Sequence, residues 1–143
     1  MKQIHGNLWS WYGKPSIIVL ITTNGIVTAG GRAIMGRGCA EEAKLRFKDI
    51  DLELGRNIRI HGNQMYSLGG GLIWSFPVKR DWRDQADLGL IGESASQLEA
   101  MALKRAEEHF ILPRPGCGNG GRTWDEVEPV IDFLPDNVLV ISK

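Results

Sequence analysis

The sequence has 143 residues, with a hydrophobic fraction of 43% and a charged fraction of 24%, values that are ordinary for one globular domain with a buried core. Its 17 Lys and Arg balance 17 Asp and Glu, whereas domains that hold duplex nucleic acid by bulk electrostatics are strongly basic. The two cysteines and three histidines have no familiar metal-site spacing. There is no signal-peptide pattern and no long apolar span. We therefore expect a single cytoplasmic, monomeric domain over residues 1–143, with no metal and no membrane association.

Apolar runs alternate with helical patterns along the chain. We expect strands at residues 3–9, 16–23, 65–68, 72–78, 110–113 and 138–141, and helices over 38–47, 86–109 and 123–134. Residues 16–23 form a continuous β-branched run, which is typical of a strand buried on both faces. Thr123 and Glu126 have the spacing of a capping box. This alternation favours an α/β layered fold, in which ligands bind beyond the carboxyl ends of the strands.

Two glycine-rich segments stand at such positions, each between an apolar run and a helical pattern. They are GGRAIMGRGCA (residues 30–40) and LPRPGCGNGGRTW (residues 112–124). Glycine lets backbone N–H groups approach a ligand, and a loop at a helix N-terminus favours anions. Two such loops indicate a ligand with two phosphates, although each loop alone is equally explained as a tight turn. Arg37 either adds a cation to the first loop or points to solvent.

The second loop also carries a family resemblance. A strand that ends in Pro113, followed by Gly-Cys-Gly and a helix that opens near Trp124, resembles the macrodomains, which bind ADP-ribose. The segments MGRG (residues 35–38), SFPVKRDWR (75–83) and GCGNGG (116–121) are most similar to the branch of antitoxin macrodomains that remove ADP-ribose from DNA and of terminal ADP-ribose protein glycohydrolases. The resemblance implies a three-layer α/β/α fold with a mixed central sheet.

The resemblance also implies a set of site residues and no cofactor. It implies that the two loops wrap the pyrophosphate of ADP-ribose or an ADP-ribosylated substrate, and that Lys79 is catalytic. The ligand-binding residues that it implies are Asn7, Leu8, Asn24, Met35, Gly36, Arg37, Gly38, Cys39, Pro113, Gly116, Cys117, Gly118, Asn119, Gly120 and Gly121.

The chain departs from the family pattern at three places. Residues 23–34 form a longer segment than in the antitoxins, so the match of Asn24 to a ribose-contacting asparagine is open. Gly120 stands where the protein glycohydrolases have an aspartate, so a lysine–aspartate pair is not available. Asn7 stands where many macrodomains have an adenine-contacting aspartate, and an amide both donates and accepts hydrogen bonds.

The reactive and aromatic side chains near these loops have alternative interpretations. Lys79 either stabilises developing charge, attacks the sugar as an amine, or is a solvated lysine in a charged stretch. Trp82 lies where it can stack on a base of a nucleic-acid substrate. For Trp9, Trp11, Tyr12 and Trp124, packing is the simpler explanation. Catalysis by Cys117 has little support, since neither loop contains a histidine.

Two functions remain open. The first is a hydrolase that removes ADP-ribose from an adduct. Single-stranded DNA is favoured over protein side chains, O-acetyl-ADP-ribose and ADP-ribose 1″-phosphate because of the segments around Lys79 and Gly118. The second is a binding module for ADP-ribose or a related nucleotide without turnover. A metal-dependent nucleotidase is a remote third, because no acidic cluster has metal-ligand spacing.

Overall fold

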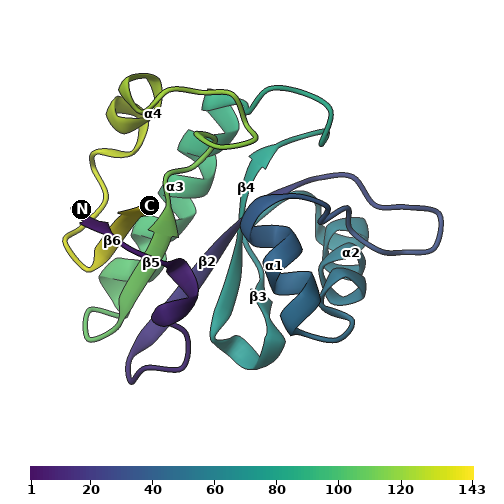
Figure 1. Cartoon of the computed structure of the whole chain (residues 1–143), viewed down its shortest axis with the longest axis horizontal. Coiled ribbons are helices and arrows are strands. Elements are labelled where there is room, and N and C mark those ends of the chain that lie inside the picture. The colour runs from purple at the N-terminus through teal and green to yellow at the C-terminus, as the bar shows by residue number, and fades with distance from the viewer.

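The computed structural model describes residues 1–143 and contains one mixed sheet with helices on both faces (Figure 1). The strands are β1 (Lys2–His5), β2 (Ile17–Asn24), β3 (Ser67–Leu68), β4 (Ile73–Lys79), β5 (His109–Pro113) and β6 (Val138–Ser142). The helices are α1 (Gly38–Arg46), α2 (Ile50–His61), α3 (Leu88–Lys104) and α4 (Trp124–Ile131). The strand order is β1-β6-β5-β2-β4-β3, and only the β3–β4 pair is antiparallel. The expected three-layer α/β/α architecture is confirmed.

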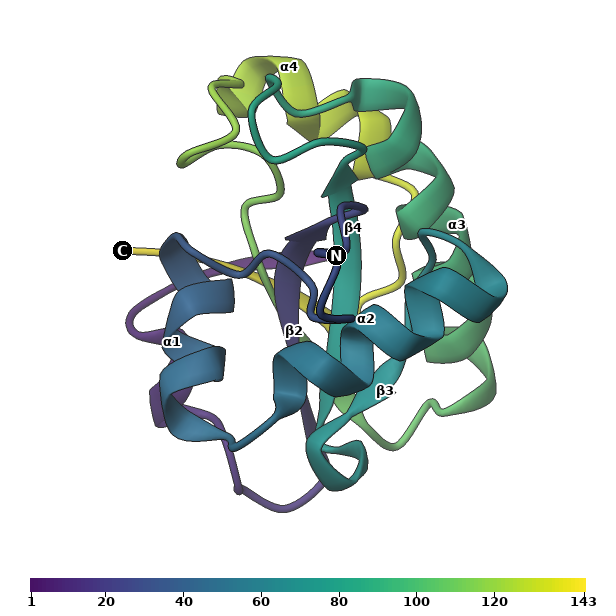
Figure 2. The same ribbon diagram turned by 90° about the vertical axis from the view of Figure 1, so that its right-hand side faces the viewer.

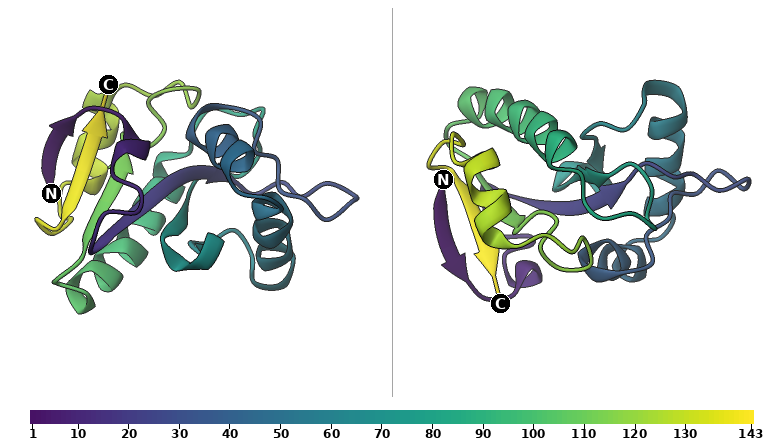
Figure 3. Two further views of the ribbon diagram at one scale, coloured as in Figure 1. Left: turned by 60° about the horizontal axis from the view of Figure 1, so that its bottom comes forward. Right: turned by 90° about the horizontal axis from the view of Figure 1, so that it is seen from above.

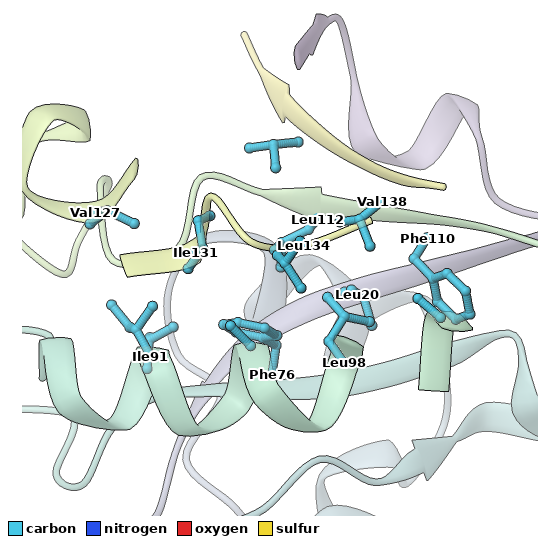
Figure 4. Close-up of a cluster of buried hydrophobic side chains, with 14 of the residues drawn as sticks. Leu20, Phe76, Ile91, Leu98, Phe110, Leu112, Val127, Ile131, Leu134 and Val138 are labelled. Carbon is cyan, nitrogen blue, oxygen red and sulfur yellow. The ribbon is translucent and has the colours of Figure 1, made fainter. Parts of the chain in front are cut away.

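The alternation of side chains along β2 produces the layers. Ile18 and Leu20 pack into a core under α3 and α4, whereas Val19 and Ile21 pack into a second core under α1 and α2. Figure 2 shows β2 and β4 between α1 on one side and α3 on the other. The core under α3 and α4 includes Phe76, which is fully buried (Figure 4). Because β2 is buried on both faces, its first five residues are all apolar, and the polar Thr22, Thr23 and Asn24 stand at its carboxyl end.

Three elements differ from the sequence prediction. β1 ends at His5 rather than near residue 9, and a short 3-10 helix, η1 (Leu8–Ser10), follows because the Asn7 side chain caps it by accepting from Trp9 N at 2.9 Å. α3 ends at Lys104, and His109 belongs to β5 instead. The helix α2 was not predicted, although three apolar residues spaced four apart (Ile50, Leu54 and Ile58) all pack against the second core.

The long segment after β2 is a hairpin that projects from the body (Figure 3). It contains an antiparallel bridge between Val27 and Ala33, and it lies against α2. A Cβ atom at Gly55 in α2 would come within 2.1 Å of the Gly31 carbonyl oxygen, so glycine is required for this approach. Arg59 from α2 donates to Thr28 O at 2.7 Å. These contacts hold the additional residues on α2. No helix in the fold is long and apolar enough to cross a membrane.

Candidate ADP-ribose cleft

A cleft of about 760 Å³ opens at the carboxyl ends of the parallel strands. Its lining includes Asn7 just after β1, Ser142 in β6, Pro113 in β5, Asn24 in β2 and Lys79 in β4. Asn7 and Lys79 are four strand intervals apart, about 19 Å at about 4.8 Å per interval. The cleft therefore fits an elongated ligand that crosses all five strands. This is the sheet edge at which α/β folds bind ligands.

The first glycine-rich loop places uncapped N–H groups on the cleft. Arg37 is the N-cap residue of α1 and makes no side-chain capping bond. The N–H groups of Gly36, Arg37 and Gly38 make no hydrogen bond within the protein. Met35 is buried beneath the loop and is 2% exposed. Unpaired N–H groups at a helix N-terminus form an anion site.

The second glycine-rich loop presents a similar row of donors without using a helix terminus. The N–H groups of Gly118, Asn119 and Gly120 make no hydrogen bond within the protein, and all three residues line the cleft. The helix that follows is closed by Thr123 and Glu126, whose side chains each accept the other's backbone N–H. The expected capping box is thus confirmed. The loop itself, and not the α4 N-terminus, faces the cleft.

Close packing fixes the shape of the second loop. A Cβ atom at Gly120 would lie 2.5 Å from the carbonyl oxygen of Gly116, and that oxygen already accepts from Arg122 N at 2.9 Å. Gly120 O in turn accepts from Ala86 N at 2.8 Å. The loop is therefore held on both sides before any ligand arrives, and its donors need little reorganisation to bind one.

The two loops meet across the cleft, next to Lys79. If Gly38 carried a Cβ atom, that atom would lie 3.3 Å from Asn119 Nδ2. Lys79 Nζ donates to Asn119 O at 3.2 Å and to Trp82 O at 3.3 Å. The ammonium thus joins the end of β4 to the second loop. Arg37 and Arg114 add positive charge to the lining, and Glu41 and Glu42 add negative charge, so a chain with zero net charge has a charged cleft.

Both cysteines have packing roles. Cys39 Sγ lies 3.3 Å from both the N and Oγ1 atoms of Thr22, and burial raises the pKa of its thiol. Burial also raises the pKa of the Cys117 thiol, which lies 3.6 Å from Pro115 O. A raised pKa disfavours the thiolate, which is the nucleophilic form. This agrees with the weak support for catalysis by Cys117. No group of three or more His, Cys, Asp or Glu side chains is arranged to hold a metal ion.

Most of the residues implied by the sequence come together in the cleft. They are Asn7, Leu8, Asn24, Met35, Gly36, Arg37, Gly38, Cys39, Lys79, Pro113, Gly116, Gly118, Asn119 and Gly120. Two members of the second loop, Cys117 and Gly121, do not line the cleft. The Cys117 side chain packs against the core under α3 and α4, and Gly121 is held by a bond from its N–H to Gly118 O and a bond from Gln85 to its carbonyl.

The cleft also contains residues that the sequence analysis did not assign to it. Among them are Thr22 and Thr23 from β2, Glu41 and Glu42 from α1, and Ser142 from β6. The signal for the strand residues is their position at the carboxyl ends of apolar runs. The aromatic residues divide as expected: Trp82 lines the cleft, while Trp9 is buried, and Trp11, Tyr12 and Trp124 pack against the cores.

Comparison with solved structures identifies this arrangement. The macrodomain of Mycobacterium tuberculosis DarG superposes with a TM-score of 0.77 at 22% identity, over 99% of this chain and 97% of that one. The chain has the macrodomain fold. A structure of Thermosipho africanus DarTG in complex with ADP-ribose gives a TM-score of 0.76 at 17% identity, over 98% of this chain and 41% of that one.

Among curated proteins, this chain is similar to the DNA ADP-ribosyl glycohydrolase of Mycobacterium tuberculosis. The identity is 25% over 145 aligned residues, which is 91% of this chain and 41% of that protein. No protein-family model matches the chain. The chain spans about two fifths of the length of the curated relatives that it matches.

The three departures from the macrodomain pattern now have structural explanations. At Gly120, any larger side chain would meet the Gly116 carbonyl, so this loop shape excludes an aspartate. Asn24 Nδ2 donates to Ile34 O at 2.9 Å, and its Oδ1 accepts from Ile26 N at 3.0 Å, so this amide closes the base of the hairpin. The Asn7 oxygen is occupied in capping η1, which leaves its amide N–H groups for a ligand.

Proposed function

We propose that this macrodomain binds ADP-ribose and hydrolyses the bond that joins the distal ribose to a modified group, with DNA-linked ADP-ribose as the favoured substrate. The proposal rests on one observation. Two rows of unpaired N–H donors, one from each glycine-rich loop, lie close together beside Lys79 in one elongated cleft. The curated relatives are DNA ADP-ribosyl glycohydrolases by name, which supports the same activity.

The two loops account for recognition of the pyrophosphate. Each row of donors comes from a different loop, and the loops approach within contact distance at Gly38 and Asn119. A hydrogen bond to a charged oxygen contributes about 1.5–3 kcal/mol, so several such bonds supply a large share of the binding free energy. Two adjacent phosphates match two adjacent rows better than a single phosphate does. Asn7, about 19 Å away across the sheet, stands at the end where the adenine would lie.

Lys79 is the candidate for the reaction itself. Hydrolysis breaks the bond from the ribose anomeric carbon to the leaving group, forms a bond from that carbon to a water oxygen, and transfers a proton to the leaving group. The Lys79 ammonium lies at the edge of the phosphate loops, held by two carbonyl oxygens. From there it can stabilise charge that develops on the sugar or leaving group. As a neutral amine it can instead attack the sugar carbon.

Two substitutions test the proposal and separate these mechanisms. In Lys79→Ala we expect release of ADP-ribose from an adduct to be abolished, while calorimetric affinity for ADP-ribose stays within a few fold. Lys79→Arg keeps the charge but has no amine nucleophile. Partial activity of Lys79→Arg supports charge stabilisation, and complete loss supports attack by the amine. Full activity of Lys79→Ala would refute the assignment.

A binding module without turnover is the second candidate. It is favoured by one observation: the two carbonyl contacts of Lys79 also give it a structural role in joining β4 to the second loop. In that case the Lys79 variants would weaken ADP-ribose binding, and the wild type would cleave no adduct. With either function, we propose that the domain acts as a monomer in the cytoplasm.

A further inference from the structure

We propose that Trp82 selects the group released from ADP-ribose, by stacking on a flat aromatic leaving group such as a nucleobase. This inference rests on the proposed function, because it concerns what lies on the other side of the bond that Lys79 helps to cleave. It assigns a specificity-determining residue to the cleft, outside the loops that hold the pyrophosphate.

The exposure of Trp82 sets it apart from the other tryptophans. Its exposed fraction is 42%, against 8% for Trp9, and the other tryptophans are all buried or half-buried. Trp74 and Trp124 pack against the core under α3 and α4. Trp82 belongs to neither core, and it lines the cleft. An exposed indole at the edge of a ligand cleft has a free aromatic face to offer.

The position of Trp82 matches the leaving-group side of the cleft. Its carbonyl oxygen accepts a hydrogen bond from the Lys79 ammonium at 3.3 Å. Lys79 ends β4, and β4 and β1 stand at opposite ends of the row of five parallel strands, so Trp82 lies at the opposite end of the cleft from Asn7. A ligand with its adenine near Asn7 and its pyrophosphate on the glycine loops brings its anomeric carbon towards Lys79. The group attached to that carbon then meets Trp82.

The turn that carries Trp82 is held in place. The Asp81 carboxylate accepts three bonds from Arg83, from the backbone N at 2.9 Å, from Nε at 3.0 Å and from a terminal guanidinium nitrogen at 2.6 Å. Arg80 pairs with Asp87 at 3.2 Å. A ring on a preorganised turn loses little entropy when a base stacks on it.

The cations beside the ring are paired with carboxylates, Arg83 with Asp81 and Arg80 with Asp87, so the preference for a nucleobase rests on the exposed indole face and not on excess positive charge. The Arg83 guanidinium carbon lies 5.9 Å from the Trp82 ring centroid, and Arg80 is on the same exposed turn. Aromatic stacking beside cations is the usual way in which proteins hold single-stranded nucleic acid.

The test compares two substrates that share ADP-ribose and differ in the leaving group. One is a single-stranded oligonucleotide with an ADP-ribosylated base, and the other is ADP-ribose 1″-phosphate, whose leaving group has no ring. For Trp82→Ala we expect kcat/KM to fall about 5- to 150-fold on the oligonucleotide and less than threefold on the phosphate. Trp82→Phe should recover most of the loss. Affinity for free ADP-ribose, measured by calorimetry, should be unchanged.

The test includes a matched control variant and results that would contradict the role of Trp82. Phe133 has an exposed fraction of 43% but does not line the cleft, so Phe133→Ala should change neither reaction. An equal loss on both substrates in Trp82→Ala, or no loss on the oligonucleotide, would overturn the role of Trp82 while leaving the proposed function intact. A wild-type protein that cleaves neither substrate would overturn the proposed function, and the inference with it.

Discussion

Replacing Gly120 by alanine should weaken ADP-ribose binding through sterics alone. The new Cβ atom would lie 2.5 Å from Gly116 O and 2.7 Å from Gly116 Cα, whereas ordinary contacts begin at 3.4 Å. The backbone must therefore move by roughly 0.9 Å, which lengthens a hydrogen bond of about 2.9 Å to about 3.8 Å, beyond hydrogen-bond range. The loss of one bond from a loop N–H to phosphate costs about 1.5–3 kcal/mol, so we expect affinity to fall about 10- to 150-fold.

Calorimetric titration of Gly120→Ala with ADP-ribose measures this loss. Gly92→Ala is the matched control, because the added Cβ atom on α3 would lie 3.4 Å from Val130 and would have no atom of either glycine-rich loop within 4 Å, so affinity should stay at the wild-type value. Overpacking should also lower the stability of Gly120→Ala by about 1–3 kcal/mol. A folded Gly120→Ala that binds ADP-ribose within threefold of the wild type would show that the second loop does not hold the phosphates.

Two further predictions concern stability. Thr123→Ala removes half of the capping box of α4, so thermal unfolding should shift down by about 3–4 °C with ADP-ribose affinity unchanged. A large loss of affinity would mean that the α4 N-terminus belongs to the binding site after all. The hydrogen bond from Arg83 lowers the pKa of Asp81 from 3.8 to about 2. Because the folded-state pKa lies below the unfolded one, Asp81 stabilises the fold above about pH 4 and loses this effect as pH falls through about 2. Asp81→Asn should therefore melt below the wild type at neutral pH by a margin that shrinks from pH 4 to pH 2, and a margin independent of pH would refute the pairing.

Local patterns in the sequence predict most of the elements of the fold. The β-branched run of β2 predicts a strand buried on both faces, and the structure places its alternate residues in two separate cores. Thr123 and Glu126 predict the start of α4 because a capping box involves only neighbouring residues. The two glycine segments predict the cleft, since both follow strands that end at the same edge of the sheet.

The failures arise where distant residues decide the structure. Gly55 in the middle of α2 weakens the helical signal, but it is needed because the hairpin backbone at Gly31 lies directly against it. No local pattern contains that contact. The second loop depends on local residues and agrees with the prediction: Thr123 and Glu126 close the α4 N-terminus as a capping box, and the loop presents its own N–H groups to the cleft.

The role of the longer segment after β2 follows from its attachments. Asn24 ties the two ends of the hairpin together through Ile26 N and Ile34 O, at the level where β2 reaches the cleft. Further out, Arg32 pairs with Asp51 at 2.9 Å. The additional residues are therefore held on α2, and the backbone returns to the cleft at Ile34 and Met35. In this way the fold holds the residues after β2 on α2 while the first glycine-rich loop lines the cleft, and it uses the Asn24 side chain at the cleft for a structural purpose.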